Sequence, residues 1–372
     1  MKILPVRTKT DMKAFVRFPA RLYKDSACWA PPLWRDEKTA YSGKKNVILK
    51  NSDYRMFLAL GDAGEVLGRV LAYVDHSFNA FYGTATGFFG AFEAVQDPAA
   101  AGALLEAAET WLRGRGMTTV RGPINPVAEC WGVLVEGFSS VPVFMAPYNP
   151  PFYDGLLAGL GYGKAKDLLA YEADTIAGYR IPDRFQRFSD GFAEKRPEFT
   201  VRRIDLKNLL RDAEAIWSIT NTALKDNWGY VPVDRTVMID MVKRLKMILN
   251  PDAVWFVEKD GTAVAYALGF PDINPTLRKI NGRMFPFGFA KLLSVKRTGR
   301  RFRLFGLAVM PEYHGLGLDV LLYKHMHDAL APQGIVMEAN YILEDNFNIR
   351  NALEKLEMKH TKTYRVYEKA LV

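Results

Sequence analysis

The chain is 372 residues long, enough for two domains, and its 49% hydrophobic and 24% charged residues are the proportions of an ordinary globular protein. A formal net charge of +9 is compatible with an acidic partner, such as a phosphate-bearing small molecule, anionic lipid or RNA, but selects none of them. A disulfide framework, a zinc site, a signal peptide and a membrane-spanning helix are not expected, because Cys28 and Cys130 stand alone and no apolar run is long enough.

The first half of the chain alternates short strands with helices. Two strand-like runs flank the turn at 61–64 and predict a hairpin. The alanine-rich stretch 99–112 predicts a helix, since Leu104, Leu105 and Ala108 recur on one face. Pro19 is expected to kink or break the first helix. The predicted strands are 2–7, 55–60, 66–74, 86–92, 118–121 and 167–172, and the predicted helices are 10–23, 99–112 and 151–160.

The second half repeats this order of elements without repeating the sequence. Its predicted strands are 199–204, 253–258, 263–270, 304–310, 335–343 and 363–369, and its predicted helices are 209–224, 236–249, 318–330 and 348–356. The segment 175–198 is rich in charge, glycine and proline, as a linker would be. We therefore expect an α/β protein of two tandem domains, 1–178 and 179–372, each with a mixed sheet flanked by helices.

A glycine loop joins the strand 304–310 to the helix 318–330. It reads His314-Gly315-Leu316-Gly317, and its glycines can take positive φ or let another backbone come close. A helix that begins directly after such a loop points unpaired N–H groups and the positive end of its dipole outward, which suits a phosphate. A plain strand-to-helix turn would also need glycine, so the loop alone leaves both interpretations open.

The order strand, glycine loop, helix, strand, helix, strand in 303–369 resembles the core of the GNAT superfamily of acyl-CoA N-acyltransferases. The family's loop is Gln/Arg-x-x-Gly-x-Gly/Ala, and the matching positions here are His314 to Asp319. The resemblance implies that this loop holds the pyrophosphate of CoA and that the acceptor amine meets the thioester where two neighbouring strands splay apart. The residues expected to contact CoA are Ala308, Val309, His314, Gly315, Leu316, Gly317, Leu318, Asp319 and Asn346.

Three positions depart from the GNAT pattern. His314 replaces Arg or Gln, Asp319 replaces a small residue, and Leu353 stands where many of these enzymes carry a tyrosine. Two like charges about 5 Å apart at an effective dielectric of about 20 repel by roughly 3 kcal/mol. A helix terminus contributes only about 0.3–2 kcal/mol. Either Asp319 turns away from the pyrophosphate, therefore, or CoA binds weakly.

The N-terminal half lacks the phosphate loop. The corresponding positions read Val95-Gln96-Asp97-Pro98, in which Pro98 has no N–H and Asp97 adds a negative charge. We expect this half to be structural.

Glu338 and Asn340 are the candidate catalytic residues. They lie two apart on the strand 335–343 and share a face. Gly306 and Ala308 on the preceding strand are small and leave room for the pantetheine arm or the acyl chain. A carboxylate beside a bound amine can accept its proton, directly or through water. A salt bridge from Glu338 to Lys or Arg at a domain interface is the alternative interpretation.

Four residues are candidates for binding the acceptor. Trp228 and Tyr230 follow the first helix of the second half, where GNAT enzymes line the acceptor side. Asp272 and Asn274 come just after a strand and could orient a polar head group. Core packing and turn chemistry explain the same residues. A helix N-cap likewise explains Asn346.

Landmarks along most of the chain narrow the resemblance to the bacterial ceramide-synthase-like (YghO-like) family, a tandem-GNAT group. The resemblance implies transfer of a fatty acyl group from acyl-CoA to a long-chain amine of the sphingoid type. The landmarks are Gly87-Phe88-Phe89-Gly90, Arg121-Gly122-Pro123-Ile124-Asn125-Pro126, Tyr148-Asn149-Pro150-Pro151-Phe152-Tyr153, Asn227-Trp228-Gly229-Tyr230, Pro271-Asp272-Ile273-Asn274, Leu343-Glu344-Asp345-Asn346 and Tyr364-Arg365-Val366-Tyr367-Glu368-Lys369.

The segment 285–303 is an insertion in the usual GNAT order. An apolar stretch that ends in a basic cluster suits an anionic membrane surface. At about 1 kcal/mol per basic residue, six bases would contribute roughly 6 kcal/mol at most. A cleft lid with a solvated tail fits the pattern equally. The segment contains Phe285, Phe287, Phe289, Leu292 and Leu293 together with Lys291, Lys296, Arg297, Arg300, Arg301 and Arg303.

We therefore expect an N-acyltransferase that uses acyl-CoA as co-substrate, holds no tightly bound cofactor or metal, and acts in the cytoplasm with at most peripheral contact to the inner membrane face. Two other functions stay open. One is an aminoacyl-tRNA-dependent transferase that uses the basic surface, although nucleic acid is not the expected partner. The other is a non-catalytic acyl-CoA-binding protein, suggested by Leu353 and Asp319. The sequence does not indicate the oligomeric state.

Overall fold

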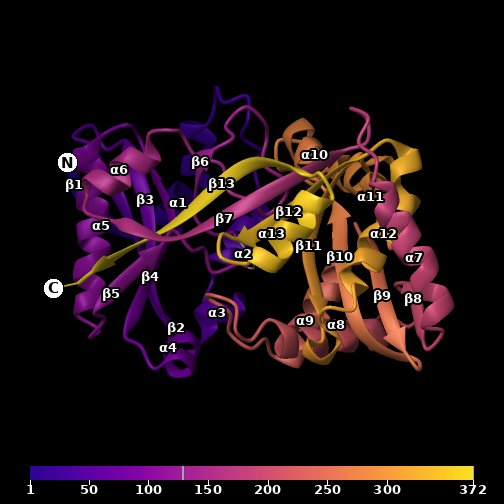
Figure 1. Ribbon diagram of the computed structural model, residues 1–372. Coiled ribbons are helices and arrows are strands. Elements are labelled where there is room, and N and C mark those ends of the chain that lie inside the picture. Colours follow the sequence, from indigo (N-terminus) through magenta and orange to yellow (C-terminus); the bar gives the residue numbers. More distant parts are fainter. Residues whose placement is uncertain (128–129, 372) are drawn as a thin grey trace. The chain divides into compact units, whose positions relative to one another are not determined.

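The computed structural model describes residues 1–127 and 130–371 (Figure 1). The chain packs into two compact units. The N-terminal unit comprises Met1–Leu169, Leu277–Phe285 and Lys362–Val372, and the C-terminal unit comprises Ala170–Thr276 and Pro286–Thr361. The expected domain division at 178/179 stays a prediction. The two units group residues that pack together, which does not show where one independently folding domain ends.

The sheet of the N-terminal unit is mixed. Its strands lie in the order β1-β2-β3-β4-β5-β13, with β6 also paired to β13. Among the described pairs β4 and β5 run parallel and the others antiparallel. The strands are β1 (Lys2–Pro5), β2 (Ser52–Leu60), β3 (Val66–Asp75), β4 (Thr86–Ala94), β5 (Thr119–Gly122), β6 (Val133–Glu136) and β13 (Lys359–Ala370).

Helices cover both faces of this sheet. Leu104, Leu105 and Ala108 of α5 (Pro98–Arg113) pack in one core with Phe57 and Val70 of the sheet. Side chains alternate along a strand, so Arg69 points to the opposite face, where its guanidinium donates to Phe15 O of α1 (Lys9–Leu22) at 2.9 Å. The remaining helices of this part are α2 (Trp34–Ala40), α3 (Val47–Lys50), α4 (His76–Tyr82) and α6 (Tyr153–Gly159).

Pro19 does not break α1, so the expected break is wrong, while the expected kink stays a prediction. Proline cannot donate the hydrogen bond that the carbonyl four residues earlier would accept. That carbonyl belongs to Phe15, and it accepts from Arg69 instead. A side chain from the sheet thus replaces the missing helical donor and keeps the helix intact.

A buried carboxylate lies in the N-terminal unit. The hydroxyl groups of Tyr23 and Tyr153 both donate to Glu93 Oε2, the second over 3.0 Å. Burial raises the pKa of Glu93 to about 7, against the attraction of Arg69 and the two tyrosine hydrogen bonds. This carboxyl therefore takes up a proton far more readily in the folded chain than in the unfolded one.

We expect the free energy of unfolding to fall as pH rises from 4.5 to 7, the window between the ordinary and the folded-state pKa of Glu93. In that window the folded chain binds the extra proton, so raising the pH removes stability, by at most about 3 kcal/mol. Urea unfolding at several pH values measures it. Glu93→Gln should flatten the slope in this window, whereas Glu65→Gln, at an exposed turn, should not. Equal slopes in all three proteins would contradict the prediction.

The sheet of the C-terminal unit has the order β12-β11-β10-β9-β8, with the end of β7 on the free side of β12. The neighbours β11 and β12 run parallel, and β8 to β11 are antiparallel neighbours. The strands are β7 (Gly163–Asp174), β8 (Phe199–Arg203), β9 (Val254–Lys259), β10 (Thr262–Pro271), β11 (Arg301–Val309) and β12 (Val336–Leu343).

Two helical layers enclose this second sheet. Residues of α8 (Leu209–Ala223) and α9 (Arg235–Leu245) share a core with Val254 and Phe256. Trp255, which points to the other face, contacts His325 of α12 (Leu318–Leu330). The other helices are α7 (Asp183–Lys195), α10 (Asn274–Lys279), α11 (Gly288–Thr298) and α13 (Phe347–Lys355). The prediction of mixed sheets flanked by helices is confirmed.

Two segments differ from their expected structure. The stretch 175–198 is not an irregular linker, because it contains α7, which packs against α12. The insertion 285–303 folds into α11 and the first residues of β11. In the described part of the chain, no helix has the length and apolar composition needed to cross a bilayer.

Candidate functional site

The strands β11 and β12 separate in the middle of the C-terminal sheet. Their parallel register ends where Leu304 lies opposite Ala339. Beyond that pair β11 still continues to Val309 and β12 to Leu343 (Figure 1). Backbone N–H and C=O groups on the facing edges of two separated strands can hydrogen-bond to an extended ligand.

A β-bulge explains why the pairing stops there. Leu304 and Gly306 of β11 lie opposite consecutive residues of β10, which leaves Phe305 as the extra residue. Such a bulge bends its strand and increases the local twist. It lies one residue past the last pair between β11 and β12, so it turns the rest of β11 away from β12.

The glycine loop follows β11 directly and leads into α12. Gly315 and Gly317 have φ of +79° and +78°, which favours glycine at both positions. A Cβ added to Gly315 would meet nothing within 4 Å, so this part of the loop is open. A Cβ added to Gly317 would lie 2.4 Å from the ring of Phe188 on α7, so packing of α7 alone already requires glycine there.

The N–H groups of this loop are available to a ligand. Among the described residues, no protein acceptor binds the backbone N–H of Gly315, Gly317 or Leu318. The imidazole Nε2 of His314 lies 2.9 Å from Val309 O, which ties the loop to the end of β11. Leu318 is buried in the core and Leu316 is half-buried. The loop therefore combines open glycine backbone with a helix N-terminus, the arrangement that binds phosphates.

Asp319 turns back onto the first turn of α12. Its carboxylate accepts from the backbone N–H of Val320 and from its own N–H, and burial raises its pKa in spite of those bonds and of the nearby His314 and Lys355. A raised pKa favours the neutral form, which reduces the repulsion that Asp319 would exert on a bound phosphate. The carboxylate thus lies at the N-terminus of α12, and the choice between the two outcomes expected for Asp319 stays a prediction.

Glu338 and Asn340 lie on one face of β12, as predicted, and contact each other. Asn340 Nδ2 donates to Glu338 Oε1 at 2.8 Å, and the Arg301 guanidinium lies 3.5 Å from Glu338 Oε2. The Glu338 side chain is fully buried. Glu338 lies opposite Arg303 in the paired part of the two strands, so a base in this place would act on the amine only when the substrate reaches this buried face next to the separation. The alternative salt bridge to an arginine is thus present, although both residues belong to the C-terminal unit, and the catalytic role stays a prediction.

Asp272 joins the same group of charges. It lies 3.9 Å from Arg301 Nε, and its Oδ1 accepts from the backbone N–H of Asn274 at 2.9 Å. Asp272 and Asn274 are both buried. Two buried carboxylates, Asp272 and Glu338, therefore share Arg301, whose side chain is 23% exposed. The turn chemistry foreseen for Asp272 is present, and contact with an acceptor stays a prediction.

Trp228 and Tyr230 lie after α8, and both are half-buried. The Tyr230 hydroxyl donates to Asn221 Oδ1, which also accepts from Val233 N at 2.9 Å. Burial raises the pKa of Tyr230 to about 12, so its hydroxyl stays protonated at neutral pH. Their contact with an acceptor stays a prediction.

Four other predicted positions have clear structural surroundings. Asn346 caps α13, since its Oδ1 accepts from Ile349 N at 3.2 Å. Leu353 is fully buried and supplies no acid in place of the family's tyrosine. Ala308 is buried opposite Tyr266 of β10, and Val309 is half-buried at the end of β11. Contact of Asn346, Ala308 and Val309 with CoA stays a prediction.

Arg301 and Arg303 were expected to belong to a basic cluster at a membrane surface, and that expectation is wrong for both. Arg303 is fully buried, its guanidinium lies 3.4 Å from Asn340 O, and it contacts the rings of Phe305 and Tyr341. Of the six bases, Lys291, Lys296, Arg297 and Arg300 are exposed, whereas Arg301 is half-buried and Arg303 is buried. The upper limit for membrane attraction by this segment falls accordingly to about 4 kcal/mol. Fully buried arginine is rare without partners, and the sequence alone does not identify those of Arg303, because they depend on the strand register.

Comparison with known proteins agrees with this arrangement. Protein YghO of Escherichia coli is 33% identical over 98% of this chain and 94% of its own length. The bacterial ceramide synthase of Caulobacter vibrioides is 33% identical over 100% of this chain and 98% of its own length. No protein-family model matches the chain.

Solved structures show the same fold at low sequence identity. A tandem GNAT protein from the clavulanic acid biosynthesis pathway superposes with a TM-score of 0.58 at 11% identity, covering 100% of this chain and 98% of that one. A GCN5-related N-acetyltransferase from Sphaerobacter thermophilus superposes with a TM-score of 0.55 at 11% identity, covering 99% and 96%. Both support the tandem GNAT fold. With the full-length relatives, they place the chain in the bacterial ceramide-synthase-like (YghO-like) family of GNAT-fold N-acyltransferases.

Proposed function

We propose that this protein transfers a fatty acyl group from acyl-CoA to the amino group of a long-chain, sphingoid-type base, and that the reaction takes place in the C-terminal unit. One observation carries the proposal. Along the chain, β11 contains the bulge at Phe305 where it separates from β12, and the open glycine loop at Gly315 follows it. Strand separation and a phosphate-binding loop thus follow each other on one stretch of chain, as acyl-CoA binding by this fold requires.

The loop 314–319 would bind the pyrophosphate through the N–H groups of Gly315, Gly317 and Leu318. The pantetheine arm would then follow the edge of β11 past Ala308 and bring the thioester toward the separation of the strands. Small side chains there leave space for the arm, since the nearest atom to a Cβ added at Gly306 would be the Tyr266 hydroxyl oxygen, at 3.5 Å. Asn346 at the start of α13 would contribute a further polar contact.

The chemical step joins the amine nitrogen to the thioester carbon and breaks the carbon–sulfur bond. An amine is nucleophilic only after its ammonium form has lost a proton, and Glu338 would accept that proton directly or through water. The departing thiolate takes one proton, so an amine and a thioester become an amide and a free thiol. Leu353 cannot supply that proton, which leaves solvent or the acid formed on Glu338 as its source.

The long-chain acceptor is supported by two features. The full-length relative with 33% identity is named a bacterial ceramide synthase. In addition, Phe285, Phe287 and Phe289 are 78%, 74% and 42% exposed, an apolar stretch beside the exposed bases of α11. We further propose that the protein works in the cytoplasm and contacts the inner membrane face through this stretch.

We expect the purified protein to acylate a long-chain amino alcohol far faster than a short polar amine. About five buried methylenes would contribute roughly 4 kcal/mol at about 0.8 kcal/mol each. Phe287→Ser combined with Phe289→Ser should reduce this preference and leave acyl-CoA affinity unchanged. Phe81→Ser, at a 47% exposed position of α4, serves as the control. Equal rates on short and long amines in the unmutated protein would leave a generic small-amine acyltransferase.

A further inference from the structure

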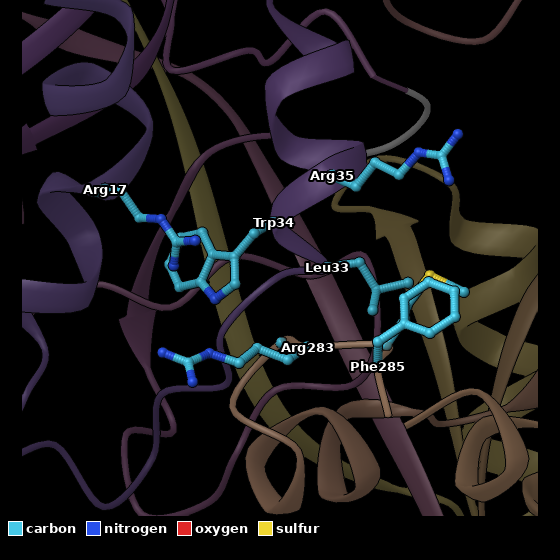
Figure 2. A pocket seen from close by; sticks show the side chains of 8 residues that line it. Arg17, Leu33, Trp34, Arg35, Arg283 and Phe285 are labelled. Carbon is cyan, nitrogen blue, oxygen red and sulfur yellow. The ribbon is translucent and has the colours of Figure 1, made fainter. Parts of the chain in front are cut away.

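A pocket of about 180 Å³ lies in the N-terminal unit, away from the glycine loop and β12 in the sequence (Figure 2). It is formed where the segment 277–285, which comes from the second half of the sequence, packs on the start of α2. The lining residues are Arg17, Leu33, Trp34, Arg35, Gly282, Arg283, Met284 and Phe285. The acyl-transfer proposal uses only Phe285 of these, and only as part of an exposed apolar stretch.

Hydrogen bonds and a tight glycine contact join the two chain segments that form the pocket. The indole N–H of Trp34 donates to Asn281 O at 2.9 Å, and its backbone N–H donates to Gly282 O at 3.3 Å. A Cβ at Gly282, whose φ is +66°, would lie 2.1 Å from Pro32 O and 2.8 Å from the indole nitrogen. Glycine is therefore required here, and the two chain segments are held together by contacts that no larger residue would permit.

One end of the pocket is strongly positive. The Arg17 guanidinium lies 4.1 Å from the centre of the Trp34 ring, and burial together with the charge of Arg283 lowers the pKa of Arg17. Figure 2 shows the guanidinium groups of Arg17 and Arg283 on the same side of Trp34. Within the described residues, Arg17, Arg35 and Arg283 form no ion pair with a carboxylate. The mutual repulsion of Arg17 and Arg283 is thus not balanced by the protein.

The other end of the pocket is apolar. Leu33 and Phe285 lie together there in Figure 2, and Arg35 points away from the other two arginines. Phe285 is 78% exposed, so this end opens to the surroundings. An anion with an adjoining hydrocarbon chain would pair with the guanidinium groups and cover the exposed ring in one binding event. Paired guanidinium groups suit phosphate oxygens in particular.

We propose that this pocket binds the phosphate of an anionic membrane phospholipid, with Arg17 and Arg283 on the phosphate and Leu33 and Phe285 against the first part of the acyl chains. The site would fix the protein on the membrane surface at one defined position. It is a second lipid-binding element, separate from the acyl-transfer site, and its existence does not depend on catalysis.

Calorimetry with dihexanoyl-phosphatidylglycerol tests the proposal. This short-chain phospholipid is soluble below its micelle concentration, so the negative surface potential of a bilayer does not contribute to binding. The full-length protein should bind it, and should bind dihexanoyl-phosphatidylcholine and inorganic phosphate at least about tenfold more weakly, a difference of about 1.4 kcal/mol. Arg17→Gln combined with Arg283→Gln should lower the affinity at least about tenfold. Arg17→Lys combined with Arg283→Lys should lower it less, because the two charges are kept although the planar guanidinium groups are lost.

The control removes the same two charges elsewhere. Lys243→Gln combined with Arg244→Gln, in the exposed last turn of α9, should bind as the unmutated protein does. Equal loss in both glutamine variants, or no binding by the unmutated protein, would overturn the proposal. Inorganic phosphate binding as tightly as the lipid would show that the pocket takes a free phosphate, and would overturn the lipid assignment. Acyl transfer by the unmutated protein is measured separately, so failure of one proposal does not imply failure of the other.

Discussion

Replacing Glu338 with glutamine is expected to lower the rate of acyl transfer by about 10²–10⁴-fold and to leave the affinity for acyl-CoA nearly unchanged, the size of effect that general bases contribute. The substitution preserves shape, and glutamine can still accept from Asn340 Nδ2, which lies 2.8 Å from the carboxylate oxygen. It removes the negative charge that would hold the proton of the amine. Single-turnover rates as a function of pH measure the effect.

A matched variant separates a chemical role from the cost of disturbing a buried ion pair. Asp212 is also fully buried in the C-terminal unit and pairs with Arg202 at 2.9 Å, outside the β11–β12 site. Asp212→Asn should destabilise the protein but retain turnover per folded molecule. If Glu338→Gln leaves the turnover and the pH–rate profile unchanged, Glu338 has no part in the mechanism and is a structural partner of Arg301.

Replacing Gly315 with glutamate should weaken acyl-CoA binding by about 10²-fold. A new carboxylate about 5 Å from a phosphate repels it by roughly 3 kcal/mol at an effective dielectric of about 20. This position is better suited to the test than Gly317, because a side chain at Gly315 meets no protein atom within 4 Å, whereas one at Gly317 would displace Phe188. Calorimetry with an acyl-CoA measures the change.

Two controls isolate the charge at the loop. Gly315→Gln has the same bulk and the same strain at positive φ without the charge, and should bind clearly better than the glutamate variant. Gly261→Glu introduces the same strain at φ +79° in the β9–β10 turn, where a Cβ meets nothing within 4 Å, and should bind normally. If Gly315→Glu and Gly261→Glu have equal affinities, the loop does not hold the phosphates.

Elements with strong local signals could be predicted from the sequence. The hairpin of β2–β3 follows from the turn at 61–64 between apolar runs, and α12 follows from leucines at helical spacing after Gly317. The shared face of Glu338 and Asn340 required only the alternation along a strand. These features depend on neighbours in the sequence, which is why they could be read without a structure.

Features that depend on contacts between residues far apart in the chain could not be predicted from the sequence. The helix α7 was concealed by the charges of 175–198, although Phe185, Phe188 and Phe192 recur at helical spacing and were the signal for it. Pro19 is accommodated by Arg69, which is far away in the sequence. The burial of Arg303 depends on the register of β11 with β12, and the pocket around Trp34 depends on packing of 277–285.

Mass spectrometry of a reaction that contains the purified protein, a long-chain acyl-CoA and a long-chain amino alcohol tests the proposed function most directly. The account predicts an N-acyl product together with an equal amount of free CoA thiol, and loss of both in Glu338→Gln and Gly315→Glu. Acyl-CoA binding without any amide product would instead indicate the non-catalytic binding protein. Product formed only when aminoacyl-tRNA is supplied, and abolished by nuclease, would contradict acyl-CoA as the donor.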